Sequence, residues 1–360
     1  MKRSPLHKRF ALLFITLTAL GCGGGSGEEE STSSALPDSE GLTLYAPMTT
    51  DSSFLLVNQE GETVHEWSTT ARANTGRLLA DGSIVMLLDT KAQPTKFGTG
   101  TAMIRKLDWD ENVLWEYENS DLHHDVCPMP NGNVMAILWE ELSAENLARV
   151  TPSRTDPLYS DVFVEINSKG KIVWEWHAQD HLTIENYTVS AASSELTHAN
   201  AVEYLAEGNA FNGKASILVS FRHIDTILAA DYKTGEVSWE FGPGKLSGQH
   251  NPTLLENGNI LVYDNRNAGL GSRVAEIFPE TGEIVWEYEA EGFYSGHISG
   301  AQRLINGNTL ICEGAEGRIF EVDPEGNIVW EHFSPDDAQV FRATRYEVEE
   351  IAWPDLTIFE

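Results

Sequence analysis

The sequence predicts an all-β protein, a six-bladed β-propeller closed by N- and C-terminal strands that share one blade. The main observation is a short phrase in which a turn residue precedes apolar residues, a tryptophan and a glutamate. Its copies lie at residues 111–116, 170–175, 235–240, 282–287 and 326–331, with a degenerate copy at 61–67. They recur every ~45 to 65 residues, a spacing typical of one four-stranded blade per repeat.

Each repeat also carries a hairpin turn ahead of its tryptophan. The turns are Asp-Gly or Asn-Gly pairs, with their glycines at Gly82, Gly132, Gly258 and Gly307. Such pairs form tight turns readily because both residues tolerate positive φ. Apolar runs at 134–138 and 260–263 follow two of these turns and indicate buried strands. A blade therefore consists of an inner strand, a turn, a second strand and a hairpin that ends at the tryptophan strand.

The sixth blade requires both ends of the propeller. Five blades follow in order from Arg77, which leaves residues 44–67 to supply outer strands and residues 340–346 to return as an inner strand. Such a closure fastens the ring without a covalent bond and leaves no free sheet edge.

The first residues read as an export signal. A basic start precedes an apolar run at 10–20, which is too short to span a bilayer. Residues 19–22 then resemble a lipobox, so we expect a lipoprotein signal peptide over 1–22 with lipidation at Cys22. An ordinary cleaved signal with an incidental cysteine is the alternative. Residues 23–41 are rich in Gly, Ser and Glu and are predicted to form a flexible tether, followed by the propeller at 42–360.

Charge restricts the partners of the chain. The formal net charge of -31 argues against nucleic acid or an anionic bilayer surface. We expect a monomer that binds small molecules and meets the membrane only through its lipid anchor. Its expected location is the bacterial cell envelope, periplasm-facing or at the outer membrane. Cys127 and Cys312 are expected to be buried free thiols, with a cross-propeller disulfide as the alternative.

Four histidines occur at related positions in four blades. His124 and His250 precede the glycine of their hairpin by eight residues, whereas His198 and His297 precede theirs by ten. A difference of two keeps a strand side chain on the same face, so these histidines are predicted to converge on one mouth of the channel. Arg222 follows on the next strand of the blade of His198.

Two kinds of site fit this set of residues. Neutral imidazoles could hold zinc or copper. Arg222 favours an oxyanion instead, because a fixed cation repels a metal ion. A histidine nitrogen could then attack the transferred group while the guanidinium and the other histidines stabilise its oxygens. We therefore expect neither a metal nor a cofactor.

Four segments resemble the active-site segments of the bacterial arylsulfate sulfotransferases, and they occur in the same order: 123–125, 198–202, 220–223 and 249–251. The resemblance implies a six-bladed periplasmic propeller that transfers sulfate between phenols without a nucleotide donor. It implies that His250 is the nucleophile that becomes sulfated, and that His124, His198 and Arg222 hold the sulfuryl oxygens. The substrate-binding set is expected to include four further residues: His123, Asn200, Asn251 and His297.

The chain departs from well-studied members of that family in two ways. It has no room for their extra N-terminal β-domain between Cys22 and Leu44, and no cysteine lies near His250. It therefore resembles a compact form of the family. Residues 231–239 also resemble the repeats of quinone-cofactor dehydrogenases, which share the blade architecture.

The expected activity is sulfuryl transfer from an aryl sulfate to a phenol by a ping-pong route through a sulfohistidine on His250. His124 or His198 is the expected proton donor to the departing phenolate. The alternative is a non-catalytic propeller lipoprotein that acts as a binding or scaffold module at the cell envelope. Fold alone does not separate the two, because propellers serve both roles.

Overall fold

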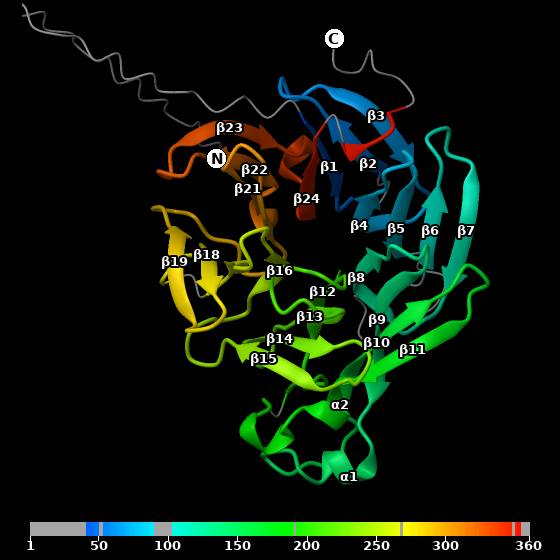
Figure 1. The fold of residues 1–360 in the computed structure, drawn as a ribbon, viewed down its shortest axis with the longest axis vertical. Helices are drawn as coiled ribbons and strands as arrows, with labels where there is room; N and C mark the ends of the chain where they lie inside the picture. Colours follow the sequence, from blue (N-terminus) through cyan, green and yellow to red (C-terminus); the bar gives the residue numbers. More distant parts are fainter. Residues whose placement is uncertain are drawn as a thin grey trace, which may run out of the picture. The chain divides into compact units, whose positions relative to one another are not determined.

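Six four-stranded antiparallel sheets are arranged in a ring in the computed structural model (Figure 1). The structure describes residues 41–49, 53–89, 103–190, 192–266, 269–347 and 350–353. The signal peptide, Cys22 and the tether up to residue 40 lie outside this range and stay predictions. The six-bladed propeller expected from the repeats is confirmed.

Five blades each use four consecutive strands. The first consists of β4 (Arg72–Leu78), β5 (Ile84–Asp89), β6 (Met103–Leu107) and β7 (Val113–Glu118). The second consists of β8 (Leu122–Pro128), β9 (Val134–Glu141), β10 (Tyr159–Ile166) and β11 (Ile172–His177). The third consists of β12 (Ala199–Leu205), β13 (Ser216–Phe221), β14 (Thr226–Asp231) and β15 (Val237–Phe241). The fourth consists of β16 (His250–Leu254), β17 (Ile260–Asp264), β18 (Arg273–Phe278) and β19 (Glu283–Tyr288). The fifth consists of β20 (Gly300–Arg303), β21 (Thr309–Glu313), β22 (Arg318–Val322) and β23 (Ile328–Phe333).

The sixth blade joins the two ends of the propeller, as predicted. Its strand order is β24 (Val340–Tyr346), β1 (Leu42–Pro47), β2 (Ser53–Val57) and β3 (Thr63–Ser68). β24 pairs antiparallel with β1, with Leu42 opposite Tyr346 and Leu44 opposite Thr344. The backbone N–H of Leu78 donates to the Tyr346 hydroxyl at 2.9 Å, which ties this blade to the first one. The C-terminal strand therefore closes the ring through ordinary sheet hydrogen bonds.

The repeated tryptophan has a structural role between blades. In five of the six blades the indole N–H of this tryptophan donates to a backbone carbonyl of the next blade in the ring, at 2.6 to 3.1 Å: Trp67 to Asp108, Trp174 to Tyr232, Trp239 to Pro279, Trp286 to Pro324 and Trp330 to Gln59. A hydrogen bond of this kind contributes about 1 kcal/mol. The tryptophan of the repeated phrase thus links neighbouring blades through a hydrogen bond.

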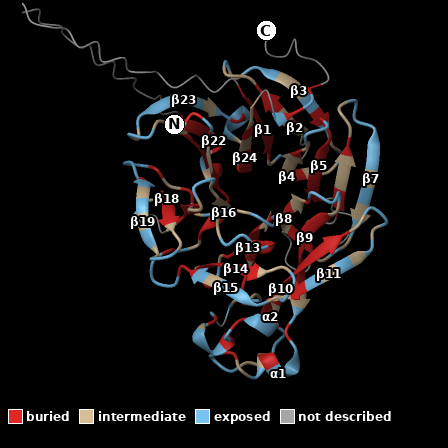
Figure 2. Cartoon of the chain, viewed as in Figure 1, coloured by how far each residue is buried: buried red, intermediate tan, exposed pale blue. Residues whose placement is uncertain are grey.

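Burial follows the order of the strands in each sheet (Figure 2). The outer strands β7, β19 and β23 alternate between exposed and partly buried residues. The middle strands β5, β13 and β21 are buried along their whole length. Cys127 and Cys312 lie on β8 and β21 and are free thiols as expected, but only Cys312 is buried and Cys127 is partly exposed. The core therefore lies between adjacent blades, as it does in other propellers.

Two insertions form a small cap beside the second and third blades. They contain α1 (Ala144–Leu147), α2 (Ala178–His181) and the 3-10 turn Ile184–Asn186, and Figure 1 shows both helices beyond β10 and β11. Their own apolar core consists of Leu142, Val150, Leu158, Ile184, Val189 and Leu196. None of the described helices is long and apolar enough to cross a membrane. Two further 3-10 turns span Gly314–Glu316 and Pro335–Asp337.

Candidate active site

The predicted histidines lie where the inner strands begin. His123 and His124 are in β8, His198 immediately precedes β12, and His250 is the first residue of β16. Neighbouring inner strands contact one another around the axis. Because inner strands of a propeller all run the same way along the axis, their first residues share one face of the ring.

Backbone irregularities at these strand starts set the directions of the side chains. His124, His198 and Asn251 have φ values of 56°, 53° and 50°, which are uncommon for residues other than glycine. The ladder is bulged between His123 and Val126 and between His250 and Thr253. A bulge shifts the alternation of side chains between faces.

The bulges change which residues are equivalent. His250 pairs with Tyr263, which lies three residues after Ile260, the first residue of β17. His123 pairs with Ile137, which lies three residues after Val134, the first residue of β9. His123, and not His124, therefore holds the ladder position of His250. At its bulge β8 has two residues more than its partner strand, whereas β16 has one more. Equal distances in sequence from the hairpin glycine therefore do not give equal positions in the two ladders.

Three of the predicted histidines nevertheless form one contact cluster. The ring of His124 lies 5.0 Å from that of His123 and 4.6 Å from that of His198, measured between centroids. The Nδ1 atoms of His123 and His124 are 2.8 Å apart, within hydrogen-bonding distance. His198 in turn stacks on His223 at 4.5 Å.

His123 is a buried anchor for this cluster. Its ring stacks on Trp139 at 4.4 Å, and its Nε2 lies 3.1 Å from Oδ1 of Asp161. The other oxygen of Asp161 accepts the backbone N–H of Ala199 at 2.7 Å. Nε2 of His123 and Oδ1 of Asp161 are close without hydrogen-bond geometry, so the carboxylate favours a proton on Nε2 through its charge alone. With that proton, a neutral His123 accepts the hydrogen bond between the two Nδ1 atoms from His124. Nε2 of a neutral His124 then carries a lone pair.

The protonation of His124 is set by its surroundings. Burial, followed by the charges of His198, the other nearby rings and Arg222, holds the pKa of His124 well below its usual value. A neutral ring with a lone pair on Nε2 accepts a proton. His124 is thus suited to take a proton from a bound group and to return it later.

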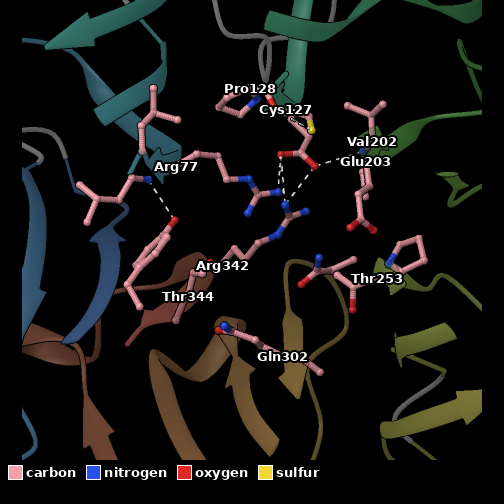
Figure 3. Close-up of a pocket in the computed structure, with 18 residues that line it drawn as sticks. Arg77, Cys127, Pro128, Val202, Glu203, Thr253, Gln302, Arg342 and Thr344 are labelled. Carbon is pink, nitrogen blue, oxygen red and sulfur yellow. Dashed lines mark hydrogen bonds and ion pairs between the residues drawn. The ribbon is translucent and has the colours of Figure 1, made fainter. Parts of the chain in front are cut away.

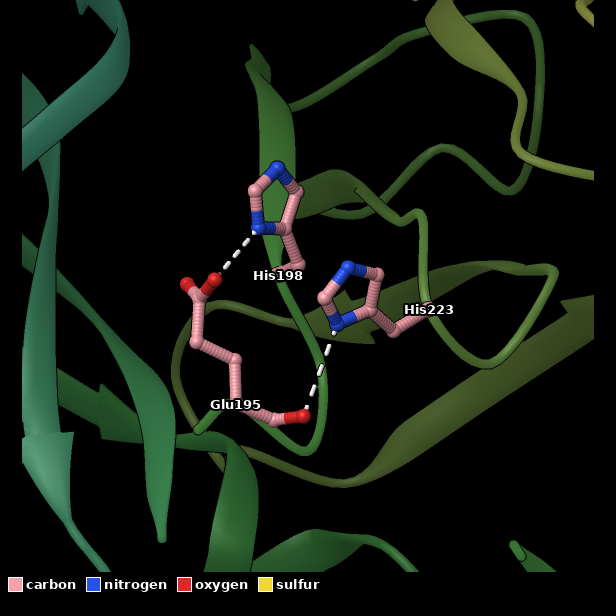
Figure 4. A group of neighbouring side chains, drawn as sticks. All are labelled: Glu195, His198 and His223. Carbon is pink, nitrogen blue, oxygen red and sulfur yellow. Dashed lines mark hydrogen bonds and ion pairs between the residues drawn. The ribbon is translucent and has the colours of Figure 1, made fainter. Parts of the chain in front are cut away.

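His198 is held by the cap (Figure 4). Its Nδ1 lies 2.8 Å from Oε2 of Glu195, and the other carboxylate oxygen accepts the indole N–H of Trp139 at 2.7 Å. Burial opposes ionisation of Glu195, but its hydrogen bond to His198 and the nearby histidine charges outweigh this and lower its pKa to about 2. Glu195 is therefore ionised, and its carboxylate fixes the orientation of the His198 ring.

The same group offers the possible ligands for a metal. Among the described residues, Glu195, His198 and His223 bring one ligand atom each within 4.8 Å of one another. The rings of His198 and His223 are stacked, and burial, followed by the charges of His198 and Arg222, lowers the pKa of His223. The charge of Arg222 also opposes a metal cation at this position.

His250 has a defined tautomer. It is 2% exposed, and its Nδ1 lies 2.7 Å from Oδ1 of Asn265 and 3.0 Å from the carbonyl of Gly248. The amide of Asn265 is oriented by its own N–H groups, which donate to the carbonyl of Ser295 and the hydroxyl of Ser299. Both neighbours of Nδ1 are acceptors, so Nδ1 carries the proton. Nε2 of His250 consequently keeps a free lone pair.

His250 is also neutral at physiological pH. Burial lowers its pKa to about 3, against the opposing effect of the Asn265 hydrogen bond and with further lowering by Arg222, His198 and Arg342. An unprotonated imidazole nitrogen is the form that acts as a nucleophile. The surroundings therefore keep His250 in its reactive form.

Arg222 lies among these histidines. Its charge contributes to lowering the pKa of His124, His250 and His297. One terminal N–H donates to the carbonyl of Gly296 at 3.3 Å, while its buried Nε has no hydrogen-bond partner in the described part of the chain. A guanidinium with an unused donor is suited to hold an anionic group.

The remaining predicted residues have different surroundings. Asn200 is buried and donates to the carbonyl of Gln249 at 2.8 Å, so it supports the segment that leads into His250. Asn251 is buried directly after His250. His297 is exposed, and Arg222 is the charge that acts on it. Unlike His124 and His198, His297 makes no ring contact with the described histidines.

Three residues around the site were not predicted: Glu195, Asp161 and Asn265. The position of Asn265 offers a signal, since it is the first residue after β17 as Arg222 is the first after β13. A polar residue directly after the second strand of a blade thus points toward the same face. Glu195 and Asp161 offer no comparable signal, because their contacts depend on the cap and on the β8–β12 contact.

Asn265→Asp should shift the acidic limb of the pH–rate profile. A carboxylate beside Nδ1 favours the protonated ring, so the pKa of His250 should rise by about 1–3 units. A neutral ring is the form whose Nε2 can act as a nucleophile. Any reaction that uses this nitrogen should therefore be lost as the pH falls, starting from a higher pH than in the wild type. The exposed substitution Asn212→Asp serves as the control. An unchanged profile in Asn265→Asp would show that Asn265 does not govern the reactive histidine.

Comparison with known proteins assigns the chain to a family. Residues 29–247, more than half of the chain, match the family model described as arylsulfotransferase (ASST). The chain belongs to the arylsulfotransferase family, as the active-site segments suggested. A second family model, PQQ_2, described as outer membrane protein assembly factor BamB, matches residues 162–347. This match supports the resemblance of residues 231–239 to the repeats of quinone-cofactor dehydrogenases, which are called PQQ-like repeats. Comparison with curated proteins gives no match.

Comparison with solved structures gives similarities at low sequence identity. A protein of unknown function from Bacteroides caccae is 15% identical, with 85% of this chain and 99% of that chain covered and a TM-score of 0.57. A catalytically inactive virginiamycin B lyase from Staphylococcus aureus with quinupristin is 11% identical, with 85% and 89% covered and a TM-score of 0.49. Apo AztD from Citrobacter koseri is 8% identical, with 85% and 98% covered and a TM-score of 0.47. At this identity the likeness concerns the fold alone.

Proposed function

We propose that the protein transfers a sulfuryl group from an aryl sulfate ester to a phenol, through a covalent intermediate on His250. One observation carries the proposal above all. His250 is buried, its Nδ1 proton is held by Asn265 and Gly248, and its Nε2 lone pair is free. The arylsulfotransferase family supplies the substrate class.

In the first step, Nε2 of His250 attacks the sulfur of the aryl sulfate. A nitrogen–sulfur bond forms as the bond from sulfur to the aryl oxygen breaks, and the aryl oxygen leaves with that electron pair. The phenolate takes a proton from a neighbouring histidine that carries one, and leaves as a phenol. The sulfated ring retains its Nδ1 proton and becomes cationic, which the carbonyl oxygens of Asn265 and Gly248 stabilise.

In the second step, the oxygen of an acceptor phenol attacks the same sulfur. The nitrogen–sulfur bond breaks, its electron pair returns to Nε2, and the phenol proton passes to a histidine base. Neutral His124, whose Nε2 has a lone pair, is the base that this arrangement favours, and the proton then passes to the histidine that gave one up in the first step. The sequence returns His250 to its starting state without a nucleotide or a metal.

The charged groups around His250 suit a transition state with charge on the sulfuryl oxygens. Arg222 has a buried Nε–H without a partner among the described residues, and His198 is paired with ionised Glu195. Donors fixed in place before reaction stabilise such charge without reorganisation. These two groups are therefore assigned to the sulfuryl oxygens.

Release of p-nitrophenol from p-nitrophenyl sulfate tests the proposal. The purified protein should release p-nitrophenol, and an added phenol should accelerate the release because it removes the sulfuryl group from the enzyme. Release without acceleration by phenol would indicate hydrolysis. Absence of release would favour the binding or scaffold role instead.

Arg222→Lys should slow the reaction by about 10²–10³-fold while the covalent intermediate still forms. Lysine keeps the charge but loses the planar fork that can hold two oxygens together. The rate is measured as p-nitrophenol release, with Arg149→Lys as the control, since Arg149 pairs with Glu185 on the surface of the cap. A wild-type rate in Arg222→Lys would remove Arg222 from the site.

A further inference from the structure

A cavity of about 380 Å³ lies along the axis of the propeller, and nothing in the proposed reaction uses it. All six inner strands line it, through residues that include Arg77, Asp125, Glu203, Thr253, Gln302 and Arg342. Its lining does not include His124, His198, Arg222 or His250. The lining residues of β8 and β16 come after the histidines of those strands, so the cavity lies further along the inner strands than the histidines.

Arg342 is the unusual group in this cavity. It is 5% exposed, and its Nη1 lies 3.1 and 3.0 Å from the two oxygens of Asp125. Its Nε and Nη2 are buried and have no hydrogen-bond partner among the described residues. These two N–H groups form the side edge of the guanidinium, which matches the two oxygens of a carboxylate. Buried charged donors without partners are rare in folded proteins, so this edge points to a ligand.

The charges around the cavity favour an anion with one negative charge. Arg77 shares Asp125 with Arg342, at 3.3 Å, so two guanidinium groups face one carboxylate. Burial raises the pKa of Glu203 to about 7, with Arg77 and Arg342 opposing the shift and Asp125 adding to it. Burial also raises the pKa of Cys127 to about 11 and that of Tyr346 above its usual value, so both are neutral.

Glu203 makes the balance dependent on pH. Below about pH 7 its carboxyl is neutral, and the group of Arg77, Arg342 and Asp125 has one positive charge in excess. Figure 3 shows Glu203 across the cavity from Arg77, with the guanidinium of Arg342 between them. The rest of the lining is largely apolar, with Leu78, Pro128, Val202 and Pro252 among it.

We propose that this cavity is a second ligand site, which binds a small organic monocarboxylate through the Nε and Nη2 edge of Arg342. The planar carboxylate matches that edge, and the apolar lining accommodates the hydrocarbon part of the ligand. A dianion is disfavoured, since only one excess positive charge is present beside Asp125. The cavity is lined by none of the four residues assigned to catalysis, although Asn251 borders both His250 and the cavity, and the inference goes beyond the proposed function.

Calorimetric titration with benzoate tests this inference on the whole protein. Benzoate should bind at about pH 6 and about tenfold more weakly at about pH 8, where most Glu203 is ionised and repels it. Glu203→Gln should bind about equally at both pH values. Arg342→Lys should weaken binding at least about tenfold, because the side edge is lost while the charge remains.

Two control variants show where benzoate binds. Arg303→Lys alters another inner-strand arginine, which pairs with Glu276 outside the cavity, and should leave binding unchanged. His250→Asn should still bind benzoate, whatever its effect on sulfuryl transfer. Loss of binding in His250→Asn would place benzoate in the sulfuryl site and overturn the inference without touching the proposed function.

Three further outcomes would also overturn the inference. They are absence of saturable binding at about pH 6, equal binding in Arg342→Lys and the wild type, and an unchanged pH dependence in Glu203→Gln. If Arg342→Lys does not fold, the Glu203→Gln titration still decides the matter, because it keeps Arg342 and alters only the ionisable carboxyl.

Discussion

His250→Asn should abolish sulfuryl transfer. Asparagine keeps a polar side chain in the buried position but has no nitrogen lone pair that can attack sulfur, so no covalent intermediate forms. Neither step of the proposed route can then occur. The measurement is steady-state release of p-nitrophenol from p-nitrophenyl sulfate, with and without added phenol.

The matched control for this variant is His181→Asn. His181 is an exposed histidine in the cap that stacks on Trp176, remote from the residues that contact His250. It should keep the wild-type rate, and both variants should retain a cooperative unfolding transition. Phenol-stimulated release by folded His250→Asn protein would contradict the assignment of the nucleophile.

Removal of the chain from residue 340 onward should abolish cooperative folding. β24 is the inner strand of the sixth blade, and its loss exposes the edge of β1 with which it pairs. It also removes Val340 and Phe341 from the interior, and Arg345 from its buried ion pair with Glu321. These losses together are expected to exceed the ~5–15 kcal/mol by which a typical domain is stable.

Size-exclusion chromatography and thermal unfolding provide the measurement for this truncation. The truncated protein should elute as aggregate or show no sharp unfolding transition, because an open sheet edge pairs with other chains. A soluble monomer with the transition of the full-length protein would show that β24 does not close the ring.

The fold was predictable because its signals are local and repeated. The tryptophan phrase marks the outer strand of each blade, and the structure shows why it recurs: the indole of one blade bonds to the backbone of the next, as with Trp239 and Pro279. The expected closing strand at residues 340–346 is β24, which pairs with β1. Its prediction required only the count of strands left over after five complete blades.

The site was less accessible from sequence, for two physical reasons. The histidines were aligned on the assumption of regular strands, in which side chains alternate between the two faces every two residues. Bulges at His124 and Asn251 break this alternation, and the sequence gives no sign of them. The groups that set protonation also come from distant segments. Asn265 fixes the tautomer of His250 from the next strand, and Arg342 reaches Asp125 only because β24 returns to close the ring.

Peptide mapping of the trapped intermediate is the most direct test of the proposed mechanism. The wild-type protein is mixed with p-nitrophenyl sulfate without an acceptor, quenched under conditions that preserve the nitrogen–sulfur bond, digested and analysed by mass spectrometry. The account predicts one peptide heavier by the mass of an SO3 group, with the modification on His250, and its disappearance when phenol is added before quenching. A modification on His124 or His198, or turnover with no sulfated peptide at any time, would contradict it.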